Sequence, residues 1–389
     1  MTTAIVDDAR ARSDRRRVGK MSENETENDR PADARTKHRI IGRRVSATVQ
    51  NTANSIAGLR ALESERENPL FVDPFAAALA GEETMTRLRA KREMVTEDGT
   101  GTTAVRDVDK GRIAIRTRFF DDAIRAFASE MDAEELRESK KGDSGGGGGV
   151  KKGSQAAKTL TGGEDSGGAK PRQIVLLGAG YDTRAWRIEA SSPAAKAATT
   201  VFELDVEAVL TRKRDIIGDV PFTLCEERIC VYADIEHSDW FDALKKSGFS
   251  EKAPTCWVLE GLMYYLKPRV AKRLLAQLAL YSAPGSTLAA SVVNPASLRR
   301  ARSAPVCLKL ARCFGRARRT GHSVWKSACD KTPDEYFAPW SVEIAAQVGE
   351  GPLNYGRWTG QIPEPAPSTK KAYKADKTPR TFYVRCKKY

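Results

Sequence analysis

The second half of the chain alternates short apolar runs with helical stretches, and this alternation restricts its possible folds more than any other feature. Stretches with helical patterning lie at 206–217, 238–247 and 267–282. Between and around them, runs rich in Val, Leu and Ile predict strands at 173–178, 200–205, 229–234, 255–261, 286–293 and, with an alternating pattern, 381–388. Strands that alternate with helices indicate parallel strands joined by crossover helices. Continuously apolar strands suit a sheet covered on both faces. We therefore predict an α/β fold with a doubly wound, Rossmann-like sheet.

Changes in composition divide the chain into four predicted segments. The first is polar, charged and aperiodic, which is typical of a disordered basic tail. The second has helical patterning and predicts a helical cap that is integral to the fold. The third contains a run of five glycines, which predicts a flexible insertion that cannot build a core of its own. The fourth carries the sheet. Their bounds are 1–44, 45–131, 132–171 and 172–389.

Two helices can be placed within the predicted cap. Asp73 and Pro74 precede Phe75 as an N-cap acid and a proline at the first helical position, and Gly81 supplies the stop of that helix. Phe120, Ile124 and Phe127 recur at helical spacing, so 112–129 is predicted to be a long amphipathic helix.

Composition excludes several classes of protein. No apolar run approaches the roughly 20 residues needed to span a bilayer, so we expect no membrane-embedded segment. The first residues include no apolar stretch of the kind that marks a secretory signal, and the seven cysteines form no CxxC pair. Both features favour a cytoplasmic protein with reduced thiols, with import into an organelle left open. The three histidines have no ligand-like spacing, so no metal site is predicted.

The turn after the first predicted strand is a candidate for close contact with a ligand. Gly178 and Gly180 allow a tight turn and close approach of the backbone to a ligand. The third glycine of a dinucleotide-binding motif would stand at 183, where the chain has Thr. Alone, the glycine pair fits a plain strand-to-helix turn equally well.

Acidic residues are predicted to follow or end the neighbouring strands at the same edge of the sheet. Asp205 lies 25 residues after Gly180, where an acid can accept hydrogen bonds from ribose hydroxyls. Glu203, Asp234 and Glu260 are the others. Crowded like charges cost stability unless a ligand compensates for them. A ligand with a ribose, an ammonium and a sulfonium would do so, and S-adenosylmethionine has all three, whereas a phosphate-rich nucleotide would be repelled.

Several blocks of sequence, in the same order, are similar to those of a known family. They are ESERENPLFVDPFAAALAG (63–81), IRTRFFDDAI (115–124), QIVLLGAGYDTRAWRI (173–188), VFELDVEAVLTRKR (201–214), PTCWVLEGLMYYL (254–266) and, more weakly, LNYGRW (353–358). With these blocks the chain resembles the leucine carboxyl methyltransferase-like family of S-adenosylmethionine-dependent O-methyltransferases, in its small-molecule branch. The resemblance begins near residue 46 and leaves out the glycine-rich segment.

The resemblance implies a set of cofactor contacts. Arg116 would bind the methionine carboxylate, with Arg118 as the second choice, and Glu260 would lie near the methionine end. The implied cofactor-binding set is Arg116, Gly178, Gly180, Asp205 for the ribose, Asp234 and Ile235 for the adenine, and Glu260. The basic residues that the family usually has after Asp234 are replaced here by Glu236-His237-Ser238. A structural salt bridge from Arg116 to Asp121 or Asp122 is the alternative to its cofactor role.

The methyl acceptor is the least constrained part of the hypothesis. A carboxylate needs no general base, whereas a hydroxyl does, and His237, Tyr264 and Tyr265 are the candidates for that base. Residues 297–329 hold nine Lys and Arg and no acid, and the whole chain has a formal net charge of +14. An anionic small molecule or peptide is the expected acceptor, and nucleic acid is disfavoured but left open. An RNA-modifying methyltransferase and a non-catalytic cofactor-binding protein are the alternatives.

Overall fold

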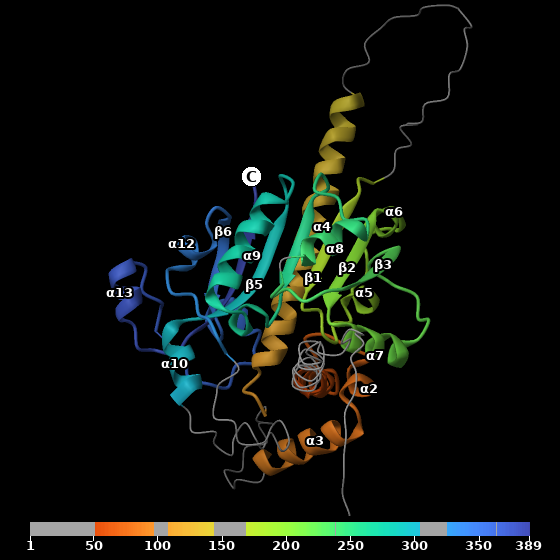
Figure 1. Cartoon of the computed structure of the whole chain (residues 1–389). Helices are drawn as coiled ribbons and strands as arrows, with labels where there is room; N and C mark the ends of the chain where they lie inside the picture. Colours follow the sequence, from red (N-terminus) through yellow and green to blue (C-terminus); the bar gives the residue numbers. More distant parts are fainter. Residues whose placement is uncertain (1–50, 97–107, 144–168, 238, 304–324, 363) are drawn as a thin grey trace, which may run out of the picture. The chain divides into compact units, whose positions relative to one another are not determined.

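A seven-stranded sheet forms the centre of the structure, a computed structural model, and its strand order is β3-β2-β1-β4-β5-β7-β6. Strands β1 to β5 are parallel, and β7 runs antiparallel between β5 and β6 (Figure 1). The strands are β1 Arg172–Leu177, β2 Thr199–Asp205, β3 Glu227–Tyr232, β4 Thr255–Leu259, β5 Thr287–Val293, β6 Ser341–Gln347 and β7 Thr381–Lys387. The predicted doubly wound α/β fold is confirmed. Strand β6 was not predicted, because its edge position leaves most of its residues partly exposed and its sequence lacks an apolar run.

The structure describes residues 51–96, 108–143, 169–237, 239–303, 325–362 and 364–389. All of these belong to one unit of the chain, Val45–Tyr389. The predicted basic tail at 1–44, most of the glycine-rich segment and the middle of the basic segment 297–329 lie outside the described residues.

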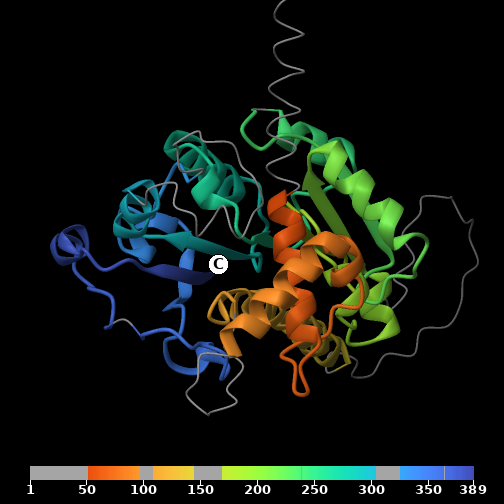
Figure 2. The ribbon, with the colours of Figure 1, turned by 90° about the horizontal axis from the view of Figure 1, so that it is seen from below.

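Helices cover both faces of the sheet (Figures 1 and 2). Residues 51–64 are helical, and the further α-helices are α2 Ala76–Ala80, α3 Glu82–Thr96, α4 Arg112–Asp143, α5 Arg184–Arg187, α6 Pro193–Ala197, α7 Glu207–Ile217, α8 Trp240–Lys246, α9 Pro268–Leu280, α10 Pro295–Ser303, α12 Pro333–Phe337 and α13 Lys370–Ala375. Two 3-10 turns are η1 Met263–Tyr265 and η2 Gly351–Asn354.

The alternation of side chains along each strand builds two separate cores. In β1, Ile174 and Leu176 belong to the core that α4 and α7 cover, whereas Val175 and Leu177 belong to the core beneath α8 and α9. Successive side chains of a strand point to opposite faces, so a strand buried on both sides must be apolar throughout. This is why the apolar runs of the sequence predicted the sheet well.

The predicted short helix of the cap begins later than expected. Helix α2 starts at Ala76 and ends before Gly81, which has a φ of +79°. The Asp73 carboxylate accepts a hydrogen bond from the backbone N–H of Phe75 at 3.2 Å, so it caps a turn that precedes the helix.

Helix α4 begins at Arg112, as predicted, but continues to Asp143 instead of ending near 129. Residues 132–143, which the sequence predicts as part of the flexible insertion, are therefore helical. Arg172, at the start of β1, explains the difference, since it pairs with Asp132 at 2.5 Å and Glu135 at 2.8 Å. These tertiary ion pairs hold a polar stretch of helix that has no apolar pattern of its own.

Within the described ranges, no helix combines the length and the apolar character needed to cross a membrane. In the same ranges no group of three or more His, Cys, Asp or Glu is arranged to hold a metal ion.

Candidate active site

The strand order reverses between β1 and β4, which lie side by side in the sheet. In open α/β sheets ligands bind at the carboxyl ends of the strands, at such a reversal. Gly178 follows β1 and Glu260 follows β4, so both lie at this position. Asp205 ends β2, the next strand.

The glycine turn and Asp205 are joined directly. Gly178 and Gly180 have φ angles of +67° and +50°, which L side chains rarely adopt. The backbone N–H of Gly180 donates to Oδ2 of Asp205 at 2.8 Å, and the N–H of Val206 donates to Oδ1 at 2.7 Å. Burial raises the pKa of Asp205 above its usual value. The two backbone bonds set the direction of the carboxylate, and each oxygen keeps a lone pair for a further donor.

Arg116 of α4 reaches across to Glu260. Its Nε donates to Oε1 of Glu260 at 2.8 Å, and the two side chains are 12% and 13% exposed. Asp121 and Asp122 are not its partners, because Arg184 and Arg187 hold Asp121 and Arg118 holds Asp122. The alternative prediction, a structural salt bridge from Arg116 to Asp121 or Asp122, is therefore wrong, because Arg116 pairs with Glu260.

Glu260 is held by two guanidinium groups. Arg184 Nη2 lies 2.8 Å from Oε2 of Glu260, while Arg116 binds the other oxygen. Burial by itself would raise the pKa of Glu260, but Arg184 and Arg116 outweigh burial and hold that pKa below its usual range. Glu260 therefore carries its negative charge at neutral pH.

Gly261 allows the side chains around Glu260 to pack closely. Its φ is +69°, and a Cβ placed on it would lie 3.3 Å from both Nη1 of Arg116 and the hydroxyl of Tyr264. The Tyr264 hydroxyl thus lies beside the Arg116 guanidinium. Sequence reasoning missed Gly261, although its position directly after Glu260 was a visible signal.

The two candidate tyrosines lie in η1 and are part of an aromatic cluster. The ring centroid of Tyr264 is 4.8 Å from that of Tyr265 and 4.9 Å from that of Trp325. The Tyr264 carbonyl accepts a hydrogen bond from the N–H of Lys326 at 2.7 Å, which fixes the Trp325–Lys326 segment beside η1. Burial raises the pKa of Tyr265.

Asp234, Ile235 and His237 lie in the turn after β3. The sequence predicts Asp234 as the last residue of the strand, but β3 ends at Tyr232. The Asp234 carboxylate accepts from the N–H of Glu236 at 2.8 Å, a local bond that competes with the strand ladder. Asp234 and His237 are exposed, with 3.9 Å between His237 Nε2 and Asp234 Oδ2. Ile235 is 6% exposed and packs in the core beneath α8 and α9. The described contacts of His237 are with Asp234 and Arg273, and none of them is with Arg116 or Glu260.

Glu203 is not part of the edge of acids that the sequence indicated. It lies inside β2, fully buried, and pairs with Lys213 at 2.6 Å and with Arg228. Its charge is balanced by side chains of the protein and needs no ligand.

The sequence profile of the leucine carboxyl methyltransferase family matches residues 53–135 and 164–279, which are 199 of the 389 residues. The chain belongs to the leucine carboxyl methyltransferase family. The match contains Arg116, the glycine turn, Asp205 and Glu260.

Relatives of this family member occur in mycobacteria. A Mycobacterium marinum protein, named as an inferred S-adenosyl-L-methionine-dependent methyltransferase, is 31% identical over 256 residues, covering 64% of this chain and 66% of the relative. A protein of the same name from Mycobacterium tuberculosis is 33% identical over 248 residues, covering 63% of this chain and 58% of the relative. The alignments thus span less than two thirds of the length of these two relatives. A crystal structure from Streptomyces avermitilis covers 86% of this chain and 97% of its own, with 11% identity and a TM-score of 0.40.

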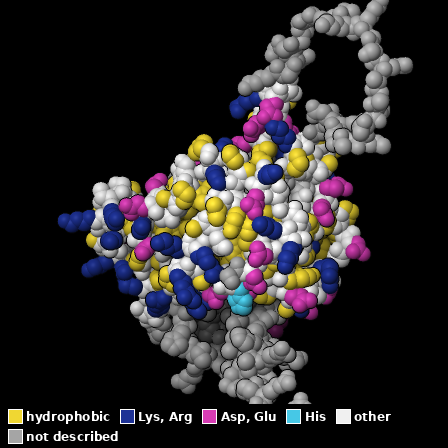
Figure 3. Space-filling view, turned by 45° about the horizontal axis from the view of Figure 1, so that its top comes forward, with side chains coloured by type: hydrophobic (Ala, Val, Ile, Leu, Met, Phe, Trp, Pro, Cys, Tyr) yellow, Lys and Arg dark blue, Asp and Glu magenta, His cyan; other side chains and the backbone are white. Residues whose placement is uncertain are grey.

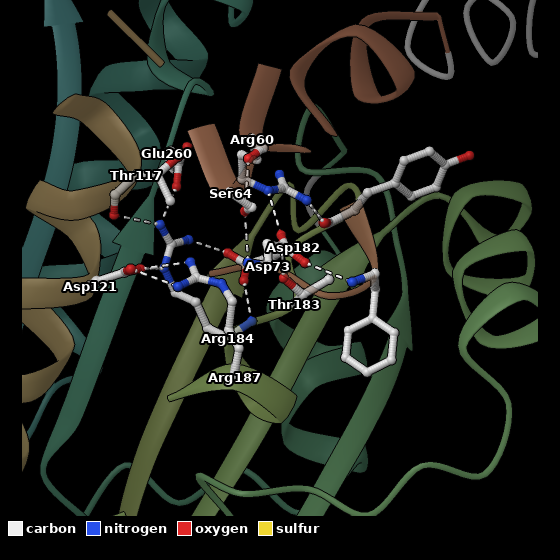
Figure 4. Close-up of polar contacts among 12 residues, drawn as sticks. Arg60, Ser64, Asp73, Thr117, Asp121, Asp182, Thr183, Arg184, Arg187 and Glu260 are labelled. Carbon is white, nitrogen blue, oxygen red and sulfur yellow. Dashed lines mark hydrogen bonds and ion pairs between the residues drawn. The ribbon is translucent and has the colours of Figure 1, made fainter. Parts of the chain in front are cut away.

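The family match also contains a buried ionic network that sequence reasoning missed (Figure 4). Arg184 of α5 contacts three carboxylates, those of Asp121, Asp182 and Glu260. Arg187, one turn later, contacts both oxygens of Asp121 at 2.6 and 2.7 Å. The charged residues of this network were present in the sequence as Asp182-Thr183-Arg184. The sequence alone, however, does not show which charged groups Asp182 and Arg184 contact.

A second part of the network ties the N-terminal cap to the glycine turn. The Asp73 carboxylate accepts from Arg60 Nε at 2.8 Å and from the Thr183 hydroxyl at 2.7 Å. Arg60 also donates to the carbonyl of Tyr181 at 2.5 Å. The cap therefore contacts the turn that carries Gly178 and Gly180 directly (Figure 4).

Proposed function

We propose that the protein is an S-adenosylmethionine-dependent O-methyltransferase that acts on a small molecule or peptide. The observation that carries this proposal is the charged pair of Arg116 and Glu260 beside the glycine turn and Asp205, at the point where the strand order reverses. Family membership and the names of the mycobacterial relatives support the cofactor and methyl transfer.

The residues at this point fit the chemistry of the cofactor. The Asp205 carboxylate has the direction and free lone pairs to accept from two ribose hydroxyls. A Cβ on Gly180 would meet only the carbonyl oxygen of Gly178, at 3.9 Å, so the backbone is open to a close-lying ligand there. Arg116 offers a planar fork for a carboxylate, and Glu260 offers a carboxylate for an ammonium. Asp234 and the backbone of Ile235 would serve the adenine.

The protein itself has little bond chemistry to perform. When bound, S-adenosylmethionine would supply a methyl group activated by its sulfonium, for transfer to an acceptor oxygen. The residues of the site orient the methionine end and the acceptor, and exclude water. A hydroxyl acceptor must also lose its proton, and Tyr264, beside Arg116, is better placed to assist than the exposed His237.

We further propose an anionic acceptor. Three basic residues are linked to the segment that follows Trp325: Arg302 donates to the carbonyl of Lys326, and Arg273 donates to the carbonyl of Glu236, whose carboxylate binds Lys326. In Figure 3 the charged side chains on the left side of the molecule, where α10 and α13 lie in Figure 1, are mostly Lys and Arg. Three bases against two acids, Glu236 and Asp234 of the same turn, leave a net positive rim that would attract a carboxylate or phosphate.

We assign the protein to the cytoplasm. The support is the set of five free cysteines in the described residues: Cys225, Cys230, Cys256, Cys329 and Cys386. Unpaired thiols are typical of a reducing compartment.

Two measurements test the proposed function. Calorimetry with S-adenosylhomocysteine should show binding to the wild type, and Asp205→Ala should weaken that binding by about 1.5–3 kcal/mol, the value of hydrogen bonds to a charged group. Glu207→Ala, in the first turn of the neighbouring α7, is the control and should bind normally. Wild-type protein that does not bind would refute the cofactor assignment, and unchanged affinity in Asp205→Ala would refute the ribose contact.

The second measurement incubates the protein with methyl-labelled S-adenosylmethionine and a panel of small acids and phenols. Label should enter an acidic acceptor. Treatment with mild alkali then distinguishes the products, because a methyl ester releases methanol and an aryl ether does not. Cofactor binding without transfer to any acceptor of the panel would favour the non-catalytic alternative, and transfer to RNA only would favour the RNA-modifying one.

A further inference from the structure

Arg184 is the most highly connected side chain around the site. Its Nε lies 2.7 Å from Asp121, its Nη1 contacts Asp182, and its Nη2 lies 2.8 Å from Glu260 and donates to the carbonyl of Thr117 at 3.1 Å. The side chain is 3% exposed. Figure 4 shows these groups converging on its guanidinium from α4, from the glycine turn and from the end of β4. With every nitrogen engaged, the guanidinium is locked in place.

Arg116 binds the same carboxylate from a more exposed position. It binds Oε1 of Glu260 through Nε, and its side chain is 12% exposed, four times as much as that of Arg184. The two oxygens of Glu260 are thus bound by one arginine that is fixed and by one that borders solvent. Removing a single partner from a buried ion pair is costly, because the remaining charge is left uncompensated. With Arg184 on the other oxygen, Glu260 keeps a charged partner when Arg116 leaves, which lowers that cost.

We propose that Arg184 is a positioning residue for the amino-acid end of the ligand. Arg184 keeps Glu260 charged and correctly oriented while Arg116 exchanges Glu260 for the carboxylate of the incoming ligand, and the freed Oε1 receives the ligand's ammonium. This inference rests on the proposed function. In this exchange the ion pair between Arg116 and Glu260 is replaced by two ion pairs with the zwitterionic ligand, one from Arg116 to its carboxylate and one from Glu260 to its ammonium. No proton is transferred.

Arg187 provides a matched comparison within the same network. It is also 3% exposed and shares Asp121 with Arg184, and its guanidinium lies 5.2 Å from the ring centroid of Phe71. Its described contacts are with Asp121 and Phe71, whereas those of Arg184 include Glu260. A purely structural network would make the two arginines equivalent in their effect on ligands.

The experiment measures the selectivity of binding in Arg184→Lys and Arg187→Lys. Each protein is titrated with S-adenosylhomocysteine, which has the amino-acid end, and with 5′-methylthioadenosine, which lacks it. Arg184→Lys should lower affinity for S-adenosylhomocysteine by about tenfold or more. Its affinity for methylthioadenosine should stay within about twofold of the wild type. Arg187→Lys should change the two affinities by the same factor.

The outcomes separate this inference from the proposed function. Wild-type protein that binds neither compound would refute the proposed function itself. Normal binding by the wild type, with equal losses for both ligands in Arg184→Lys or with the same selective loss in Arg187→Lys, would overturn the role of Arg184 alone.

A second variant covers the case in which Arg184→Lys does not fold. Asp121→Asn keeps the shape of its side chain and removes the charge that fixes Arg184 Nε. It should show the same selective loss to a smaller degree. Unchanged selectivity in Asp121→Asn would contradict the proposal.

Discussion

Arg116 and Glu260 lie 144 residues apart in the sequence, and Nε of Arg116 donates to Oε1 of Glu260 at 2.8 Å. One comes from the helical cap and the other from the end of β4, so the pair exists only when the cap is packed against the sheet. An opposite-charge pair at this position matches the two ends of an amino-acid zwitterion. The cap is therefore part of the candidate site.

Arg116→Lys should weaken binding of S-adenosylhomocysteine by about 1.5–3 kcal/mol and also reduce turnover. A lysine keeps the charge but has no planar fork to grip a carboxylate. Arg118→Lys is the matched control, because Arg118 lies two residues later on α4 and pairs with the half-exposed Asp122. Normal affinity and turnover in Arg116→Lys, with only a lower melting temperature, would limit Arg116 to a structural pairing with Glu260.

Gly261→Ala should disturb the site as well as the backbone. The φ of Gly261 is +69°, so an alanine costs roughly 1–2 kcal/mol of stability, and its Cβ would press on Arg116 and Tyr264 at 3.3 Å. Gly218→Ala is the control, since its φ is +67° with no heavy atom within 4 Å of the added Cβ. Denaturant unfolding should show similar losses of stability in both variants. Calorimetry should show weakened binding of S-adenosylhomocysteine in Gly261→Ala only. Equal ligand affinity in the two would mean that the close packing at Gly261 does not affect the site.

Stability should fall in acid because of Asp182. Burial would raise its pKa, but Arg184, Arg187 and Lys213 outweigh burial and lower the pKa to about 2 from an ordinary value of 3.8. The folded state therefore binds this proton more weakly than the unfolded state. The stabilisation is complete well above pH 3.8 and is lost as the pH falls towards 2, with about 1 kcal/mol lost between roughly pH 5 and pH 3.

Urea unfolding at several pH values measures this contribution. The free energy of unfolding of Asp182→Asn should fall less steeply between about pH 5 and pH 3 than that of the wild type. Asp219→Asn, which changes an exposed carboxylate, should follow the wild-type curve. A parallel curve for Asp182→Asn would show that the ionic network does not perturb this carboxyl.

The helical residues 132–143 should contribute to stability through Arg172. This arginine is 2% exposed and pairs with Asp132 and Glu135, so Asp132→Asn combined with Glu135→Gln should cost about 3 kcal/mol or more. Glu138→Gln removes the pair with Lys170, in which both side chains are about half exposed, and should cost ~0.5 kcal/mol or less. Thermal unfolding compares the variants. A double variant as stable as Glu138→Gln would support the original assignment of 132–143 to the insertion.

The sequence by itself determined the fold class and the central strands. Strands β1, β2, β4 and β5 are buried on both faces, and strands buried in this way have continuous apolar sequences. Val175 and Leu176 could therefore be predicted as strand residues without knowledge of their neighbours in space. The glycine turn and Asp205 could be predicted for a similar reason, because each depends on a local property of the chain: a positive φ at Gly180 and an acid at a strand end.

Only the tertiary structure decided which charges are balanced. Glu203 and Glu260 look alike in the sequence, but Lys213 and Arg228 compensate the first inside the core, while Arg116 and Arg184 bind the second at the candidate site. Coulomb energy depends on distance in space and on burial, and neither can be read from the spacing of residues along the chain. For the same reason the extension of α4 to Asp143 was missed, since its partner Arg172 lies in β1.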